Sequence, residues 1–304
     1  MAHYVKVASV LFQTEAKKGH DDAKRIVLGE TAQTLESLKG FGLDLVVFSE
    51  GVESYGQRVE DAEEIASPGP FLKLYMDYAV SQRCCVAGSV KLFDGGKVYN
   101  SIAFVGPDGT ILGVYHKTNL TVWEIEPGVS SGSGAVVVDT PVGRLGGIVC
   151  FDLNFEDIRN EYRTLRPDII VFPSMFHGGL LQQIWAYQCR AYFVSALPRI
   201  GGGILDPFGT PLALTHFCSS VATATINLDR VMVHLDFNKE RFPDIRRKYA
   251  DEVEICVPAN VDRALIISRT QKRSAVDIVS EFGVEPIDEY FDRSTEANVR
   301  NRRK

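Results

Sequence analysis

The sequence lacks the patterns that mark several functional classes. Its six cysteines form no CxxC pair and no disulfide-like framework, and its six histidines are scattered without HxxxH or HxH spacing. No metal site is therefore predicted, and no cofactor is expected. A glycine-rich phosphate loop is also missing, because the glycines at 201–203 lie between predicted strands and are typical of a close-packed turn.

Charge and hydropathy argue against two further classes. The net charge of −6 disfavours general nucleic-acid binding, and the basic end at residues 300–304 is interpreted as a solvated tail. No apolar run is long enough to span a bilayer, and the N-terminus enters a strand without the apolar core of a signal peptide. Together with the unpaired cysteines, this predicts a cytoplasmic protein that neither enters membranes nor binds nucleic acid.

Hydrophobic periodicity predicts alternating strands and helices with several hairpins, and no linker interrupts the pattern. The composition, 45% hydrophobic, supplies ample material for a core. From these residues alone we predict a layered α/β protein. Strands are predicted at residues 5–12, 44–49, 85–92, 100–105, 111–115, 135–139, 144–149, 168–172, 212–215, 221–227 and 231–236, and helices at 22–39, 71–82, from 155, 179–194 and 272–281.

One stretch stands out because a cysteine ends an apolar strand. Residues 144–149 are followed by Cys150, then by Asp152 and Asn154, which suit the N-cap of a helix beginning near Phe155. Such a strand-to-helix elbow favours a thiolate and offers backbone N–H groups to an oxyanion. The alternative is a buried cysteine that acts as a small hydrophobe, and this stretch alone leaves both open.

Two other strands end on charged residues. The segment DLVVFSE ends at Glu50, and the strand before YHKTNL ends close to Lys117. Active sites of open α/β sheets lie at the C-terminal ends of strands. With GRLGGIVCFDLNFED and the Asp206-Pro207-Phe208-Gly209 turn, this ordered set resembles the nitrilase superfamily of carbon–nitrogen hydrolases over about residues 5–229.

The resemblance implies a four-layer α-β-β-α sandwich with two mixed β-sheets. It also implies a hydrolase that forms a thioester on Cys150, with Glu50 as general base and Lys117 as oxyanion stabiliser. A second glutamate is expected after the lysine, and Glu124 is favoured over Glu126 because Trp123 could shield it from water. An alternative for Glu50 and Lys117 is a surface ion pair.

The resemblance also suggests the domain organisation and the assembly. We predict a carbon–nitrogen hydrolase domain at residues 1–260 and a C-terminal helical extension at 261–304. The extension packs either on its own domain or on a partner subunit, since one helix face carries Ala275, Ile278 and Val279. A homodimer or a larger homo-oligomer is expected.

The loop after the cysteine bears on the substrate. Phe151 stands where nitrilases carry tryptophan, and no arginine stands between Cys150 and Arg159. The Cys-x-Asp-x-Asn arrangement resembles that of the aliphatic amidases, so a small amide is favoured. The alternatives are an N-carbamoyl compound, a nitrile, or a non-catalytic assembly protein. Phe151, Asn154, Phe176 and His177 are the predicted substrate-binding residues, whereas His116, Trp185 and Arg190 are interpreted as structural.

Overall fold

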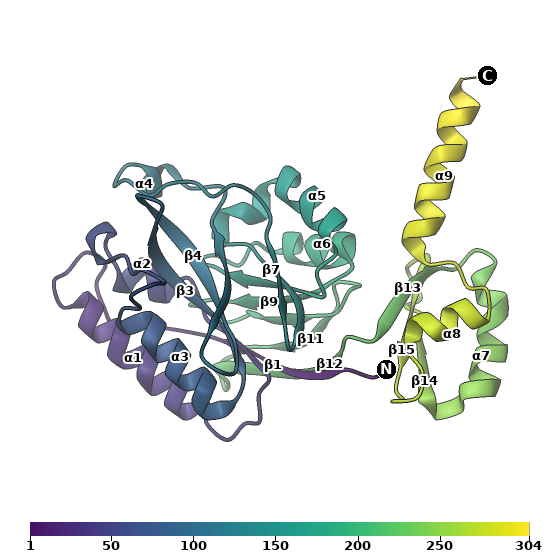
Figure 1. Ribbon diagram of the computed structural model, residues 1–304, viewed down its shortest axis with the longest axis horizontal. Helices are drawn as coiled ribbons and strands as arrows, with labels where there is room; N and C mark the ends of the chain where they lie inside the picture. The colour runs from purple at the N-terminus through teal and green to yellow at the C-terminus, as the bar shows by residue number, and fades with distance from the viewer. Residues whose placement is uncertain (304) are drawn as a thin grey trace. The chain divides into compact units, whose positions relative to one another are not determined.

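Two six-stranded mixed sheets form the centre of the larger part of the chain (Figure 1). The computed structural model describes residues 1–303, and the unit that contains these sheets comprises Val5–Thr225. The first sheet has the order β12 (Val221–Asn227), β1 (Tyr4–Val10), β2 (Leu45–Val47), β3 (Cys85–Asp94), β4 (Lys97–Val105) and β5 (Ile111–His116). The second has the order β11 (Pro211–Leu214), β10 (Gly203–Leu205), β9 (Tyr192–Ala196), β8 (Ile169–Pro173), β7 (Gly143–Gly147) and β6 (Val137–Thr140).

Helices cover the outer faces of both sheets. Figure 1 shows α1 (Ala23–Ser37) and α3 (Pro70–Gln82) beside the first sheet, and α5 (Glu156–Leu165) and α6 (Leu180–Cys189) beside the second. Strand β2 contacts β8 and β9, so the inner faces of the sheets meet. The predicted four-layer sandwich with two mixed sheets is confirmed. Short helices α2 (Gly51–Gly56), η1 (Val59–Asp61), α4 (Val122–Ile125) and η2 (Cys150–Asn154) lie in the connections.

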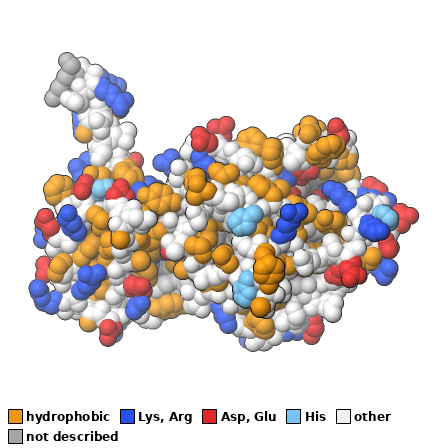
Figure 2. Space-filling model, turned by 180° about the vertical axis from the view of Figure 1, so that it is seen from behind, with side chains coloured by type: hydrophobic (Ala, Val, Ile, Leu, Met, Phe, Trp, Pro, Cys, Tyr) orange, Lys and Arg blue, Asp and Glu red, His pale blue; other side chains and the backbone are white. Residues whose placement is uncertain are grey.

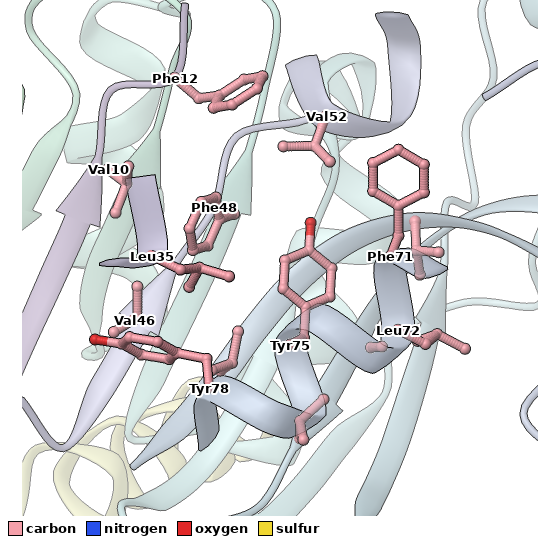
Figure 3. Close-up of a cluster of buried hydrophobic side chains, with 14 of the residues drawn as sticks. Val10, Phe12, Leu35, Val46, Phe48, Val52, Phe71, Leu72, Tyr75 and Tyr78 are labelled. Carbon is pink, nitrogen blue, oxygen red and sulfur yellow. The ribbon is translucent and has the colours of Figure 1, made fainter. Parts of the chain in front are cut away.

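The outer core of the first sheet forms because β2 and α3 bury their apolar side chains together. Val46 and Phe48 lie against α3, and the rings of Phe48 and Tyr75 are 5.6 Å apart (Figure 3). Each such side chain contributes about 1.5–3 kcal/mol when fully buried. This packing holds the C-terminal end of β2, where Glu50 follows, in a fixed place.

Close packing of the two sheets explains the glycine at position 147. A Cβ atom on Gly147 would lie only 2.9 Å from the side chain of Ile102 and 3.1 Å from that of Phe104. Both residues belong to β4 of the first sheet, so β7 approaches that sheet too closely for any side chain at this position. The close approach brings the end of β7 near the strands that carry the charged residues.

One predicted helix was too long. The helix expected at 179–194 ends at Cys189, where Arg190 adopts a left-handed conformation with φ 55°. The chain then enters β9, which is buried throughout and carries Tyr192, Phe193 and Val194. Aromatic and β-branched residues favour a strand when neighbouring strands pair with them, and β8 and β10 do so here.

The second compact unit contains Met1–Tyr4 and the chain from Ile226 onward. Its antiparallel sheet has the order β13 (Arg230–His234), β15 (Arg263–Ser268) and β14 (Val253–Cys256). The predicted boundary at residue 260 falls inside this unit, and the strands β14 and β15 were not predicted. The helices are η3 (Asn238–Arg241), α7 (Phe242–Tyr249), η4 (Ala250–Glu252), α8 (Ala275–Glu281) and α9 (Ile287–Arg302).

The apolar face of α8 is buried within its own unit. Ala275, Ile278 and Val279 are at most 3% exposed, and α8 contacts β13 and β15. This face therefore contacts strands of its own chain, and the packing of the extension on a partner subunit stays a prediction. Across residues 1–303, no helix combines the length and the apolarity that crossing a membrane requires.

Candidate active site

Cys150 lies at a backbone corner, as predicted. It begins η2 three residues after Gly147, the last residue of β7, and has φ 46°, which is a strained conformation for a residue with a side chain. The backbone N–H of Phe151 belongs to the first turn of this short helix, where N–H groups have no acceptor within the helix. The corner therefore places the Cys150 sulfur and the backbone N–H of Phe151 on one short segment.

Asp152 holds this corner against the neighbouring loop, and it is not the N-cap of α5 that was predicted. Its carboxylate accepts hydrogen bonds from the backbone N–H of Val149 at 3.0 Å, from that of Asn119 at 2.7 Å and from the Tyr115 hydroxyl at 2.8 Å. The predicted caps are wrong because α5 begins after Phe155, with no side-chain cap. Asp152 instead ties the nucleophile corner to the loop that carries Lys117.

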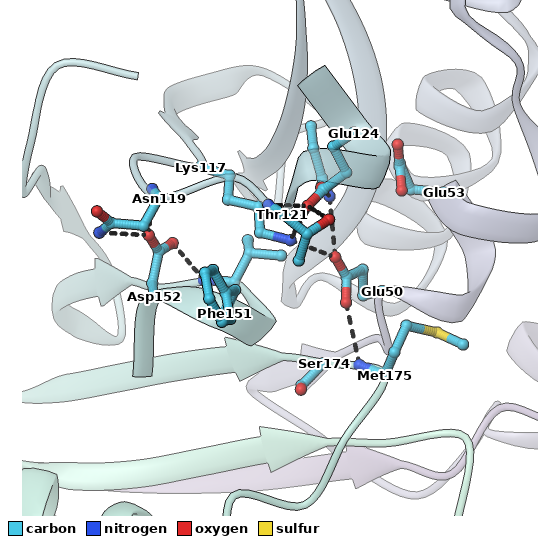
Figure 4. Close-up of polar contacts among 12 residues, drawn as sticks. Glu50, Glu53, Lys117, Asn119, Thr121, Glu124, Phe151, Asp152, Ser174 and Met175 are labelled. Atoms are coloured by element: carbon cyan, nitrogen blue, oxygen red, sulfur yellow. Dashed lines mark hydrogen bonds and ion pairs between the residues drawn. The ribbon is translucent and has the colours of Figure 1, made fainter. Parts of the chain in front are cut away.

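Glu50, Lys117 and Glu124 form one connected cluster (Figure 4). Lys117 Nζ lies 2.9 Å from Glu50 Oε1 and 2.9 Å from both oxygens of Glu124. Glu50 and Lys117 are 2% and 1% exposed, so the pair is buried and is not a surface ion pair. The other Glu50 oxygen, Oε2, accepts the backbone N–H of Met175 at 3.0 Å. Three separate elements thus deliver these groups to one place.

The cluster determines its own charge state. Burial alone would lower the pKa of Lys117, but the nearby Glu50 and Glu124 carboxylates raise it above its ordinary value. Burial alone would raise the pKa of Glu124, but Lys117 and hydrogen bonds from Thr121 and Asn100 lower it below its ordinary value. Lys117 is therefore cationic and Glu124 anionic at neutral pH.

The expectation that the corner favours a thiolate is wrong for the free protein. Burial and the adjacent Glu50 carboxylate raise the pKa of the Cys150 thiol to about 12, although Lys117 and the Met175 N–H act in the opposite direction. A neutral thiol beside a carboxylate needs that carboxylate to take its proton as it attacks.

Of the two candidate second glutamates, the structure brings Glu124 into the cluster. Its Oε2 also accepts the backbone N–H and the hydroxyl of Thr121, both at 2.9 Å. Glu126 is exposed to solvent. The expectation that Trp123 shields Glu124 is wrong, since Trp123 is 77% exposed. Lys117 and Thr121 enclose the carboxylate instead.

The predicted substrate-binding residues surround the nucleophile loops, but their polar contacts are mainly with backbone. The Asn154 amide donates to the Phe151 carbonyl at 3.0 Å. His177 accepts the Gly179 N–H at 3.0 Å and lies 3.1 Å from the Gly201 carbonyl. Phe151 packs edge-on against Phe155, and Phe176 against Phe172. Their contact with substrate stays a prediction.

One histidine, one tryptophan and one arginine were interpreted from the sequence as structural and not catalytic. His116 lies 2.8 Å from Ser101 Oγ and stacks on Tyr99, away from the Lys117 ammonium contacts. Trp185 is fully buried and donates to the Leu153 carbonyl at 2.8 Å, beneath the Cys150 corner. Arg190 ends α6. These contacts agree with supporting roles.

Sequence reasoning missed Asn100 and the backbone of Met175. The Asn100 amide donates to Glu50 Oε1 and to Glu124 Oε1, both at 2.9 Å. A signal was present in the sequence, because Asn100 opens an otherwise apolar strand segment. The Met175 contribution carries no signal, since any residue except proline supplies the same N–H.

Two cavities lie near the cluster, one lined by Glu124 and the other by Met175, whose N–H binds Glu50. One cavity of about 380 Å³ is lined by Glu124 and Trp123 and by the buried ion pair of Glu53 and Lys91. A second, of about 590 Å³, is lined by residues that include Met175, Tyr55 and Arg199. Tyr55 lines both cavities. Among residues 1–303, no group of three or more His, Cys, Asp or Glu side chains is arranged to hold a metal ion.

The profile of the carbon-nitrogen hydrolase family matches residues 13–232, which is well over half of the chain and includes the whole cluster. The chain belongs to the carbon–nitrogen hydrolase family. The family resemblance predicted from the three motifs is thereby confirmed, and the protein is an enzyme of the carbon–nitrogen hydrolase type.

Relatives of this carbon–nitrogen hydrolase include two omega-amidases. Omega-amidase NIT2-B of Xenopus laevis is 28% identical over 258 residues, covering 74% of this chain and 90% of that protein. Omega-amidase NIT2 of Homo sapiens is 27% identical over 201 residues, covering 57% and 71%.

Solved structures share the fold. Saccharomyces cerevisiae Nit3, a member of branch 10 of the nitrilase superfamily, has a TM-score of 0.64 at 18% identity, covering 82% of this chain and 95% of that one. A CN-hydrolase superfamily protein from Xanthomonas campestris has a TM-score of 0.63 at 20% identity, covering 79% and 96%.

Proposed function

We propose that this enzyme hydrolyses the C–N bond of a small amide and releases ammonia through a thioester on Cys150. The observation that carries the proposal is the connected cluster of Glu50, Lys117 and Glu124, with the Cys150 thiol beside Glu50. The omega-amidase relatives support an amide as substrate. Phe151, where nitrilases carry tryptophan, speaks against a nitrile.

The first half of the reaction forms the thioester. The Cys150 sulfur attacks the amide carbon while Glu50 takes the thiol proton, so a C–S bond forms and the carbonyl oxygen becomes an oxyanion. Lys117 and the backbone N–H of Phe151 stabilise that oxygen. Glu50 then gives the proton to the amide nitrogen, the C–N bond breaks, and ammonia leaves.

The second half releases the acid. Glu50 takes a proton from water as the water oxygen attacks the thioester carbon, and the resulting oxyanion meets the same donors. Collapse breaks the C–S bond, and the proton on Glu50 returns to the Cys150 sulfur. Glu124 holds Lys117 by both of its oxygens. One of these contacts can pass to the oxyanion without leaving the lysine unpaired.

The test measures ammonia release by the purified wild-type protein from neutral aliphatic amides, amides that carry a carboxylate, N-carbamoyl amino acids and aliphatic nitriles. We expect release from at least one class of amide and none from nitriles. Ammonia from nitriles alone, or from no compound in the panel, would contradict the proposal.

Arg199 favours a second candidate, the hydrolysis of an N-carbamoyl amino acid. Its guanidinium lines the cavity that Met175 also lines. Within residues 1–303 it makes no recorded hydrogen bond or ion pair, and it is exposed. An unpaired arginine beside the site suits a substrate carboxylate, which accepts two hydrogen bonds from a guanidinium.

Substituting Arg199→Met separates the candidates. If the substrate is a carbamoyl amino acid, KM for it should rise about 10- to 100-fold, since hydrogen bonds to a charged group contribute roughly 1.5–3 kcal/mol. Values of KM for neutral amides should stay unchanged. Arg25→Met is the matched control, because Arg25 is exposed on α1 and lines neither cavity. Equal KM values for carbamoyl substrates in both variants would remove the second candidate.

A further inference from the structure

Asn100 and Lys117 bind the same two oxygen atoms. The Asn100 Nδ2 lies 2.9 Å from Glu50 Oε1 and 2.9 Å from Glu124 Oε1. Lys117 Nζ is also 2.9 Å from each of them. Each of these oxygens therefore accepts one bond from an amide and one from an ammonium group, and the two carboxylates are fixed side by side.

This pattern distinguishes the two oxygens of Glu50. Oε1 accepts two strong hydrogen bonds, which occupy both of its lone pairs and disfavour a proton there. Oε2 accepts only the N–H of Met175, at 3.0 Å. Oε2 therefore keeps an acceptor position open, and the Cys150 thiol lies beside this carboxylate. The geometry therefore leaves Oε2 as the proton acceptor.

We propose that Asn100 is a positioning residue for the reaction, whose amide directs the thiol proton to Glu50 Oε2 and holds Glu124 beside Glu50. The inference rests on the proposed function. A neutral amide does this without titrating, so its contribution is constant across the working pH range. A second lysine at this position would instead add a charge and a competing proton donor.

The bonding of Asn100 itself supports a role in the site. The residue is 1% exposed, and its Oδ1 is buried without a hydrogen-bond partner in the described part of the chain. A buried acceptor left unpaired destabilises the folded state. An amide retained for stability alone would have both ends bonded, whereas only the end that faces the two carboxylates is bonded here.

The charged groups around Asn100 are few. On its own side it faces Glu50, Glu124 and Lys117, with Cys150 beyond Glu50. On the adjacent strand β3, its cross-strand partner is Lys91, which is already paired with Glu53. Both lysines near Asn100 are therefore already paired, and neither can replace the amide.

The experiment compares Asn100→Leu and Asn100→Asp with the wild type. Two rates are followed against pH: ammonia release, and the alkylation of Cys150 by iodoacetamide, read by mass spectrometry of the Cys150 peptide. Because the Asn100 hydrogen bond lowers the pKa of Glu124, its removal should let Glu124 protonate at higher pH. The acid limb of both profiles should then move upward by about one pH unit in Asn100→Leu.

The turnover number should respond more than substrate binding. We expect kcat to fall about 10- to 100-fold in Asn100→Leu with KM within about threefold, since a misdirected proton transfer affects the transition state. Asn100→Asp should lose more, because it places a third carboxylate against two others.

Asn238→Leu is the matched control. Asn238 is also buried, and its amide donates to the His234 and Glu285 carbonyls in the other compact unit. This variant should lose stability but keep the wild-type pH profiles. Unshifted profiles in both Asn100 variants would overturn the inference, even if those variants are less stable. The alkylation profile needs no substrate, so it tests Asn100 even if the wild type releases no ammonia, a result that would refute only the proposed function.

Discussion

Replacing Cys150 by alanine is expected to lower kcat for ammonia release by about 10⁴-fold or more, because the covalent route then has no nucleophile. No other thiol stands in for it: Cys84, Cys85 and Cys189 are buried in the core, Cys218 is exposed on a turn, and Cys256 is half-buried in β14. The measurement is steady-state ammonia release by the wild type and the variant under identical conditions.

The control for this prediction is Cys218→Ala, which removes an exposed thiol and should keep wild-type activity. The thioester itself can be intercepted. Hydroxylamine added during turnover should compete with water and give the hydroxamate of the acyl group in the wild type and none in Cys150→Ala. Activity above a few per cent in the alanine variant, or hydroxamate formed by it, would refute a cysteine thioester.

Replacing Lys117 by methionine is expected to abolish activity and to lower the free energy of unfolding by about 3–5 kcal/mol, because breaking a buried ion pair leaves uncompensated charge. Two carboxylates depend on this one ammonium group: Glu50, which is 2% exposed, and Glu124. Denaturant unfolding, followed at neutral pH with ammonia release as the second measurement, tests both parts.

The loss of stability should depend on pH in a defined direction. The raised pKa of Lys117 means that its contribution is complete below the ordinary lysine value, about 10.4, and is lost as the pH rises through the folded-state value. The lowered pKa of Glu124 means that its contribution is present above the ordinary glutamate value and is lost as the pH falls through the folded-state value. The difference between wild type and Lys117→Met should therefore be largest between about pH 5 and pH 10.

Two further variants make the test specific. Adding Glu124→Gln to Lys117→Met removes one of the stranded charges and should recover part of the stability but none of the activity. Lys248→Met removes an exposed pair with Glu281 and should cost less than about 1 kcal/mol. A loss in Lys117→Met no larger than that in Lys248→Met would show that the cluster is not held by its charges.

Much of the sandwich followed from local patterns. Apolar runs bounded by turns predicted β2 and β8 within a few residues, because a strand buried on both faces requires such a run whatever its neighbours are. The helix at 179–194 failed at its C-terminal half, where β9 lies between β8 and β10. Pairing with strands distant in sequence decided that segment, and local pattern does not contain it.

What the sequence by itself determined is the identity of the charged residues and the cysteine at the ends of their strands, since each follows directly on an apolar run. The tertiary structure alone decided how they combine. Asn100 joins Glu50 to Glu124 only because β4 lies between β3 and β5. Met175 contributes a backbone N–H, which the type of residue at that position does not indicate. Burial of Cys150 beside Glu50 likewise raises the pKa of its thiol, where its place at a helix start predicted the reverse. Proximity and burial arise from packing across the two sheets, and these are properties of the folded chain.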